Sequence, residues 1–186
     1  MSHRSSVVVF VGSLRKGSFN AAIARALPDL APEGMTVTLL DGLGSLPHYD
    51  ADLQAEGFPD TVLRLAEAVK AADGVAFVTP EYNYSVPGVL KNGIDWLSRV
   101  SPQPFAGKPV VIQSASAGVL GGVRAQYHLR QTLVFLDALP MNKPEVMVGA
   151  AGTKISGTGE LTDQPTRDFI RGQLSNFAAF IDRVRV

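Results

Sequence analysis

The sequence predicts a doubly wound α/β fold, in which helices cover both faces of a five-stranded parallel sheet. Short runs rich in β-branched residues alternate with longer segments of helical periodicity, which is the arrangement of crossover units. The short runs are apolar almost throughout, as expected of strands that are buried on both faces. A chain of 186 residues is long enough for one complete core and short for two. We therefore expect residues 1–186 to form a single domain.

Five strands and five helices alternate along the chain in this prediction. The strands are Ser6–Val11, Thr36–Leu40, Gly74–Thr79, Pro109–Ser114 and Glu145–Gly149, and the helices lie near Asn20–Leu30, Asp60–Ala72, Pro87–Ser98, Gly122–Leu139 and Gln164–Val184. Asp60 is the expected N-cap of the second helix, which carries an apolar stripe at helical spacing. Residues 41–60 and 149–165 are rich in Gly, Pro and Asp, so we expect loops there, with a short hairpin in the second.

Charge and cysteine content exclude several classes of protein. Seventeen basic and seventeen acidic residues cancel, which predicts no general affinity for nucleic acid or for an anionic membrane. The absence of cysteine rules out a disulfide framework, a thiolate metal site and a cysteine nucleophile, and it permits a cytoplasmic location. The apolar run near the N-terminus is too short for a signal peptide or a spanning helix. No targeting segment is therefore expected.

The loop after the first strand, GSLRKGSFN, is rich in hydrogen-bond donors. It offers the hydroxyls of Ser13 and Ser18, the Asn20 amide, the Arg15 guanidinium and the free N–H groups of the following helix. Ligands of doubly wound folds collect at the carboxyl ends of the strands, where the strand order reverses. A terminal phosphate monoester has three oxygens and close to two charges, so it suits convergent donors. The loop therefore predicts a site for a mononucleotide phosphate.

Two other nucleotide loops and a purely structural role are the alternatives for this segment. Gly12 and Gly17 have the separation of a P-loop, but the Lys and Ser/Thr that should follow the second glycine are absent. The second glycine of a Rossmann loop is absent too, although Asp41 lies about where a ribose-binding acid would. In the structural alternative, Ser18 only caps the helix and Arg15 is solvated.

The loop after the third strand, from Pro80 to Ser85, is the second candidate site. In the strand order 2-1-3-4-5, strands one and three flank the point of reversal, so this loop would face the first one. Tyr82, Asn83 and Tyr84 suit a flat, partly polar ring system, and FMN combines such a ring with a terminal phosphate. The alternative is that both tyrosines are ordinary half-buried residues.

Other side chains capable of chemistry are expected to be structural. Trp96 is expected in the core or in an interface, and Lys91 and Asp95 are expected to form a solvated pair on one helix. The three histidines have no ligand-like partner nearby in the sequence and are expected to be structural or solvated: His3, His48 and His128. We therefore expect no metal site.

The chain resembles the NADPH-dependent FMN reductase family of flavodoxin-like proteins, particularly its bacterial chromate and quinone reductases. Three motifs in order carry the resemblance, which extends over almost the whole chain: GSLRKGSFN, PEYNYSVPGVLKNGIDWLSR and GGVRAQYHLRQTLVFLDALPMNKPE. The resemblance implies a flavodoxin-like sheet of order 2-1-3-4-5. It also implies an FMN-containing oxidoreductase that takes hydride from NADH or NADPH and is a homotetramer, a dimer of dimers.

The resemblance also implies which residues form the site. Those that would hold the phosphate are Ser13, Leu14, Arg15, Ser18, Phe19 and Asn20. The isoalloxazine would lie against Pro80, Glu81, Tyr82, Asn83 and Tyr84, with Ser116 or Ser114 closing the ring site after strand four. Arg124, Tyr127 and Glu145 match a polar network between subunits.

The expected chemistry takes place on the flavin, whose N5 accepts and returns the hydride, so no catalytic side chain is expected. NAD(P)H and then the oxidant, a quinone or chromate, would use the same pocket in a ping-pong sequence. An anionic oxidant needs a cation beside the ring, and the candidates are Arg99, Arg124 and Lys91; alternatively, Arg99 satisfies helix carbonyls. Tyr84 is also expected to contact the substrate. The rival functions are a flavodoxin-type electron carrier, whose strongly acidic surface this neutral chain lacks, and a structural domain without FMN.

Overall fold

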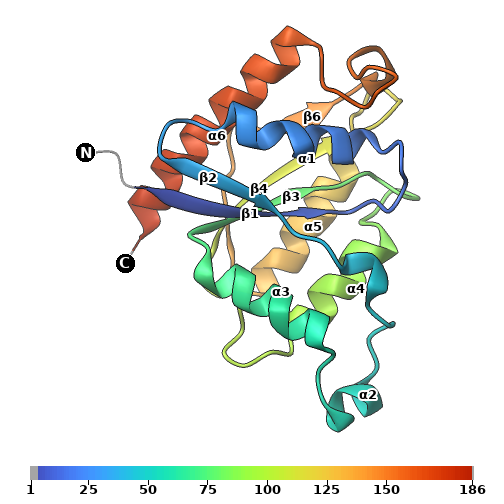
Figure 1. Cartoon of the computed structure of the whole chain (residues 1–186), viewed down its shortest axis with the longest axis vertical. Helices are drawn as coiled ribbons and strands as arrows, with labels where there is room; N and C mark the ends of the chain where they lie inside the picture. Colours follow the sequence, from blue (N-terminus) through green and yellow to red (C-terminus); the bar gives the residue numbers. More distant parts are fainter. Residues whose placement is uncertain (1–3, 186) are drawn as a thin grey trace.

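A parallel sheet between two layers of helices forms the centre of the chain, and the computed structural model describes residues 4–185 (Figure 1). The strands are β1 (Ser5–Val11), β2 (Met35–Leu39), β3 (Gly74–Val78), β4 (Pro109–Ala115), β5 (Leu139–Pro140) and β6 (Val146–Val148). The α-helices are α1 (Phe19–Leu30), α2 (Ala51–Glu56), α3 (Asp60–Ala71), α4 (Gly88–Leu97), α5 (Val123–Phe135) and α6 (Gln164–Val184), with 3₁₀ turns η1 (Leu43–Ser45) and η2 (Ala151–Thr153). Within residues 4–185, no helix combines the length and apolarity needed to cross a membrane.

The strand order confirms the predicted doubly wound topology. The strands run β2-β1-β3-β4-β5, with β6 paired to β4, and every pairing is parallel. β1 and β3 are neighbours at the point where the order reverses, so the loops that leave their carboxyl ends lie next to each other. The fold therefore brings both predicted site loops to one edge of the sheet.

The fifth position of the sheet is shared by two short strands. β5 pairs with the first two residues of β4, and β6 pairs with the last three. The predicted strand Glu145–Gly149 is therefore confirmed as β6, whereas the predicted helix Gly122–Leu139 is wrong at its end. Helix α5 stops at Phe135 because Asp137 takes a left-handed φ of 52° and the Leu139 N–H donates to the Lys108 carbonyl at the start of the sheet pairing.

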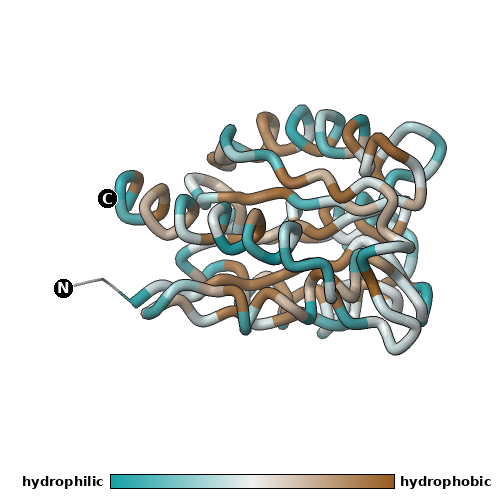
Figure 2. Tube along the Cα trace, turned by 90° about the horizontal axis from the view of Figure 1, so that it is seen from above, coloured by the Kyte–Doolittle hydropathy of each residue, from teal (hydrophilic) through white to brown (hydrophobic). Residues whose placement is uncertain are grey.

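Two hydrophobic cores lie on the two faces of the sheet. Alternate residues of β1 point to opposite faces, so Val8 and Phe10 pack under α3, α4 and α5, whereas Val7 and Val9 pack under α1 and α6. On the first face, the Phe10 and Phe77 rings are stacked with centroids 5.5 Å apart. Figure 2 shows the same arrangement, with hydrophobic residues along the strands and polar residues on the outer turns of the helices and on the loops.

The segment between β2 and α3 is anchored to α4. Residues 41–60, which we expected to be a loop, contain η1 and the short helix α2. Trp96 is fully buried, as expected; its Nε1–H donates to the Pro47 carbonyl at 2.9 Å, and Tyr49 packs edge-on against its ring. Asn92 adds hydrogen bonds to the backbone of Pro47 and Tyr49.

Two smaller predictions have opposite outcomes. Asp60 is not the N-cap of α3, because Pro59 occupies that position without a side-chain hydrogen bond and Asp60 is already helical. The hairpin predicted within residues 149–165 is confirmed by an antiparallel bridge between Ile155 and Leu161.

Candidate functional site

The first site loop leaves the sheet where β1 and β3 are in close contact. The Gly12 N–H donates to the Val78 carbonyl at 2.9 Å, which extends the pairing of the two strands by one residue. A Cβ at Gly12 would lie 2.5 Å from Thr79 Oγ1, so no larger residue fits there without movement of Thr79. The glycine therefore serves close packing of the two loops at the reversal point.

Ser18 begins helix α1 and leaves two helix N–H groups free. Its hydroxyl accepts from the Ala21 N–H at 3.2 Å and its carbonyl accepts from the Ala22 N–H, so the capping role expected in the structural alternative is real. The N–H groups of Phe19 and Asn20 have no intrahelical acceptor, because they belong to the first turn, and none is provided elsewhere in residues 4–185. These two donors lie at the positive end of the helix dipole, where an anion is stabilised.

The Asn20 side chain points into the protein rather than out of the loop. Its amide donates to the Ala115 carbonyl at 3.0 Å, and its oxygen accepts from the Ala115 N–H at 2.9 Å. The side chain thus fastens the start of α1 to the end of β4 and is 3% exposed. Of Asn20, the backbone N–H is the group available to a ligand.

The middle of the loop is exposed and carries its charge. The Arg15 guanidinium lies 5.3 Å from the centroid of the Phe19 ring, and the Ser13 hydroxyl is within 3.4 Å of the Arg15 N–H. Leu14 is 64% exposed and meets the backbone of Gly44 in η1. The loop therefore presents a hydroxyl and a guanidinium above the helix N-terminus.

The second site loop forms a tight turn that exposes two tyrosines. Tyr82 and Ser85 exchange two backbone hydrogen bonds of 3.0 Å, while Asn83 and Tyr84 have left-handed φ values of 50° and 69°. Such angles occur in the mirror-image turns of tight hairpins, and they are costly for a bulky residue such as tyrosine. Tyr82 and Tyr84 are 49% and 64% exposed, so the turn holds two aromatic faces out toward solvent.

Glu81 connects this turn to helix α5. Its carboxylate accepts from the N–H groups of Arg124 and Ala125, at 2.9 and 3.3 Å, and from the Arg124 guanidinium at 2.9 Å. Burial raises the pKa of the Glu81 carboxyl, but these hydrogen bonds and the Arg124 charge outweigh it, so the pKa lies below its ordinary value. Glu81 therefore caps α5 as an anion. Both of its carboxylate oxygens accept hydrogen bonds from α5, so the side chain faces that helix and not a ligand.

Arg124 and His128, one helical turn apart on α5, both contact the tyrosine turn. The Arg124 Cζ lies 3.8 Å from the centroid of the Tyr84 ring, and His128 Nδ1 is 3.0 Å from the Ser85 hydroxyl. Sequence reasoning missed the His128 contact; its only signal was the four-residue spacing from Arg124, which places both on one helix face.

Ser116 lies at the carboxyl end of β4, half-buried, and its hydroxyl donates to the Gly118 carbonyl. Ser114, the alternative, is fully buried and hydrogen-bonded to the Gly121 carbonyl and the Gln126 amide, so it is not available to a ligand.

Several residues that the sequence suggested for the site lie away from the phosphate loop and the tyrosine turn of the same chain. Arg99 lies past the far end of α4, about 15 Å along that helix from the tyrosine turn, with its guanidinium 5.1 Å from the centroid of the Tyr49 ring. Lys91 pairs with Asp95, as expected. Glu145 pairs with Lys143 and approaches Arg130, not Arg124, and Asp41 pairs with Arg64.

The combined site suits a phosphorylated aromatic cofactor. Free helix N–H groups, the Ser13 hydroxyl and Arg15 lie at the end of β1, and exposed tyrosines lie at the end of β3 next to it. The first set of donors matches a phosphate monoester and the second matches a planar ring, so the residues present fit FMN. Fold and site together define a flavin-binding protein of the doubly wound class.

Comparison with known proteins identifies the family. The model of the family described as "NADPH-dependent FMN reductase" matches residues 5–153. A quinone reductase of Escherichia coli strain K12 is 59% identical, and an NAD(P)H-dependent FMN reductase of Pseudomonas aeruginosa is 49% identical, each with complete coverage of both chains. The solved structure of the flavoenzyme NAD(P)H:(acceptor) oxidoreductase FerB from Paracoccus denitrificans has a TM-score of 0.86 and 37% identity, covering 96% of this chain and 98% of its own. The chain belongs to the NADPH-dependent FMN reductase family, with FMN as cofactor and NAD(P)H as electron donor.

Proposed function

We propose that this chain is an FMN-dependent NAD(P)H:quinone reductase. The observation that carries the proposal is the pairing of a phosphate-type loop with an exposed tyrosine turn at the reversal point of the sheet. The quinone reductase from E. coli is 59% identical over the full length, which supports the same substrate class here. Bound FMN would supply the redox chemistry: NAD(P)H gives up a hydride and becomes NAD(P)⁺, and the quinone gains the two electrons and the proton of that hydride and a second proton from water, so that it leaves as the hydroquinone.

In this proposal the protein's own residues bind and orient. Ser13, Arg15 and the N–H groups of Phe19 and Asn20 hold the phosphate, and Ser18 keeps those N–H groups in place by capping α1. Tyr82 and Tyr84 lie beside the ring, with Pro80 and Asn83 completing the turn and Ser116 at its rim. Glu81 and Arg124 hold that turn against α5, so we assign them positioning roles.

We further propose that the donor and the oxidant use one binding place in turn. Both tyrosines are exposed on the open side of the turn, whereas Glu81 and Ser85 are occupied by partners in α5, so the exposed aromatic surface is the one place beside the ring that we assign to donor and oxidant alike. Initial rates measured over a matrix of NADPH and quinone concentrations should give parallel double-reciprocal lines. Intersecting lines would show that both substrates bind together and would refute this part of the proposal.

Purification provides the direct test of the activity. The protein should be yellow, release FMN on denaturation, and oxidise NADH or NADPH when a benzoquinone is added. A protein that is reduced only in the presence of a separate reductase would be an electron carrier of the flavodoxin type instead. A protein that neither contains nor takes up FMN would overturn the whole proposal.

Chromate is proposed as a second oxidant, with Arg124 as the cation nearest the tyrosine turn. Because that guanidinium is already paired with Glu81, its field at an oxidant is reduced, and we expect chromate to be a poorer substrate than quinone. A kcat/KM for chromate equal to that for benzoquinone would contradict this ranking.

The outer face of α5 supports the proposal of a homotetramer. Tyr127, Val134 and Phe135 are 49%, 75% and 84% exposed on this helix, which is an unusual amount of apolar surface for one face. Covering this face by a second copy would also bring Tyr127 and Arg124 to a subunit boundary. Light scattering should give a mass near four chains, and Phe135→Glu should lower it. A cytoplasmic location, where NAD(P)H is available, is part of the same proposal.

A further inference from the structure

A cavity of about 470 Å³ lies directly beside the phosphate loop and shares Ser18 and Phe19 with the site described above. Its walls are the start of α1 and the glycine-rich segment 155–159, and the residues that matter for its chemistry are Lys16, Ser18, Phe19, Arg25, Ser156 and Thr158. Its size lies within the range of small-molecule sites. Because Ser18 and Phe19 belong to both places, the cavity is continuous with the loop that would hold the FMN phosphate.

The charges around this outer cavity are all positive. Lys16 and Arg25 line it, and no aspartate or glutamate does. One N–H of Arg25 donates to the Gly159 carbonyl at 3.0 Å, and the guanidinium makes no other hydrogen bond within residues 4–185. The hydroxyls of Ser156 and Thr158 are hydrogen-bonded to each other at 2.7 Å, so one of the two keeps its hydrogen for donation to an anion. Such a set of donors suits a phosphate monoester with close to two charges.

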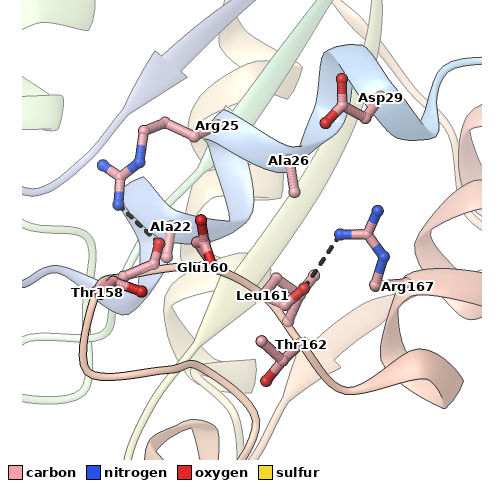
Figure 3. A pocket seen from close by; sticks show the side chains of 10 residues that line it. Ala22, Arg25, Ala26, Asp29, Thr158, Glu160, Leu161, Thr162 and Arg167 are labelled. Atoms are coloured by element: carbon pink, nitrogen blue, oxygen red, sulfur yellow. Dashed lines mark hydrogen bonds between the residues drawn. The ribbon is translucent and has the colours of Figure 1, made fainter.

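The neighbouring cavity along α1 has a different character. Figure 3 shows this second cavity, with Arg25 donating to the loop at Gly159; Arg25, Thr158 and Gly159 line both cavities. Asp29 and Glu160 line this second cavity and offset the charges of Arg25 and Arg167, and Arg167 already donates to the Leu161 carbonyl. Mixed charge disfavours a dianion there, so the phosphate belongs in the outer cavity.

We propose that the outer cavity binds the 2′-phosphate of NADPH and that Lys16 and Arg25 thereby set a preference for NADPH over NADH. The inference rests on the proposed function, because it needs a nicotinamide donor bound across the flavin site. NADPH and NADH differ only in this phosphate, and two cations in a cavity whose own lining contains no acid discriminate a dianion from a hydroxyl. The adenosine of the same ligand would fill the rest of the cavity beside Phe19.

The test uses the FMN-loaded protein and its variants Lys16→Gln and Arg25→Gln. Calorimetric titration with 2′,5′-ADP, which carries the 2′-phosphate without the nicotinamide, should show a Kd that rises about tenfold in each variant. The Kd for 5′-AMP should be unchanged. In rate measurements the KM for NADPH should rise by a similar factor, while the KM for NADH and the kcat with either donor stay the same.

Arg171→Gln is the matched control, because it removes the same charge from an exposed arginine of α6 outside the cavity. This variant should bind 2′,5′-ADP and 5′-AMP with the same Kd values as the wild-type protein. Arg25→Lys, which keeps the charge, should restore most of the binding of 2′,5′-ADP. Circular dichroism and flavin content establish that each variant is folded and loaded.

Three results would overturn the inference. The first is equal weakening of NADPH and NADH binding, and the second is no weakening of either. The third is that the variant apoproteins lose FAD binding while the ratio of the KM for NADPH to the KM for NADH stays as in the wild type. That result would assign the cavity to the adenylate of FAD. Failure of the proposed function has a different signature, since the wild-type protein would then bind no FMN or oxidise neither nucleotide.

Discussion

Arg124 lies over the Tyr84 ring, with its Cζ 3.8 Å from the ring centroid, while the same guanidinium donates to Glu81 at 2.9 Å. A cation over an aromatic face and a charge-assisted hydrogen bond thus fix one tyrosine of the turn from the side of α5. Tyr84 has a left-handed φ of 69°, a conformation that needs support from its surroundings. The relationship explains how an exposed, strained turn is kept in one shape for a flat ring.

Arg124→Ala should therefore weaken both FMN binding and the fold. We expect the FMN Kd to rise about tenfold, because the turn becomes mobile, and the free energy of unfolding of the apoprotein to fall by about 1–2 kcal/mol. Arg124→Lys keeps a charge beside Glu81 but loses the planar contact with Tyr84, so it should recover stability and not FMN affinity. Flavin fluorescence titration and urea unfolding measure the two quantities; an unchanged FMN Kd in Arg124→Ala would refute the positioning role.

Ser13 and Ser18 should separate ligand binding from helix capping. The Ser18 hydroxyl accepts from the Ala21 N–H, so Ser18→Ala should cost about 1 kcal/mol of stability even without FMN. Among residues 4–185 the Ser13 hydroxyl makes one hydrogen bond, a long one from the Arg15 N–H at 3.4 Å, so Ser13→Ala should leave the apoprotein stability within about 0.5 kcal/mol. It should still raise the FMN Kd several-fold. If Ser13→Ala leaves the FMN Kd unchanged, Ser13 does not contact the phosphate.

The sequence predicts the arrangement of this site better than the role of each side chain. Alternation of apolar runs and helical segments predicts the parallel sheet, and the strand order 2-1-3-4-5 that the family resemblance implies then places both loops at the reversal point, as the structure confirms. The partners of Asn20 and Glu81, however, are 95 and 43 residues away in the sequence, so no local pattern reveals that Asn20 points inward or that Glu81 caps α5. The division of the fifth strand into β5 and β6 is likewise decided by pairing with β4 rather than by its own sequence.

Asn20→Ala should destabilise the whole fold rather than only the ligand site. The side chain makes two hydrogen bonds with the backbone of Ala115 in a buried position, and its loss leaves both an N–H and a carbonyl without a partner. Since each orphaned buried group costs about 1–3 kcal/mol, we expect the free energy of unfolding to fall by about 2–4 kcal/mol. Urea denaturation of the apoprotein measures this, with Asn176→Ala on the exposed face of α6 as the control. A loss below about 0.5 kcal/mol in Asn20→Ala would contradict the anchoring role.

Glu81 should make the stability of the protein depend on pH in the acid range. Hydrogen bonds from Arg124 and Ala125 outweigh burial and depress the pKa of this carboxyl below its ordinary value of 4.5. A depressed pKa in the folded state contributes stability above pH 4.5 that is lost as the pH falls through the folded pKa, because the unfolded chain binds the proton first. Glu81→Gln removes this contribution, so the wild-type protein should be more stable than the variant by about 1–2 kcal/mol at pH 7.

The difference between wild type and Glu81→Gln should then shrink as the pH falls below 4.5, where the wild-type carboxyl becomes protonated. Urea unfolding of both proteins without FMN, at intervals between about pH 7 and pH 3, removes the titration of the FMN phosphate from the comparison. Glu160→Gln is a suitable control, since this exposed carboxylate lies on the other side of the sheet from α5 and forms no ion pair within residues 4–185. A wild-type advantage over Glu81→Gln that stays constant across the whole range would mean that the charge of Glu81 is not what holds the turn to α5.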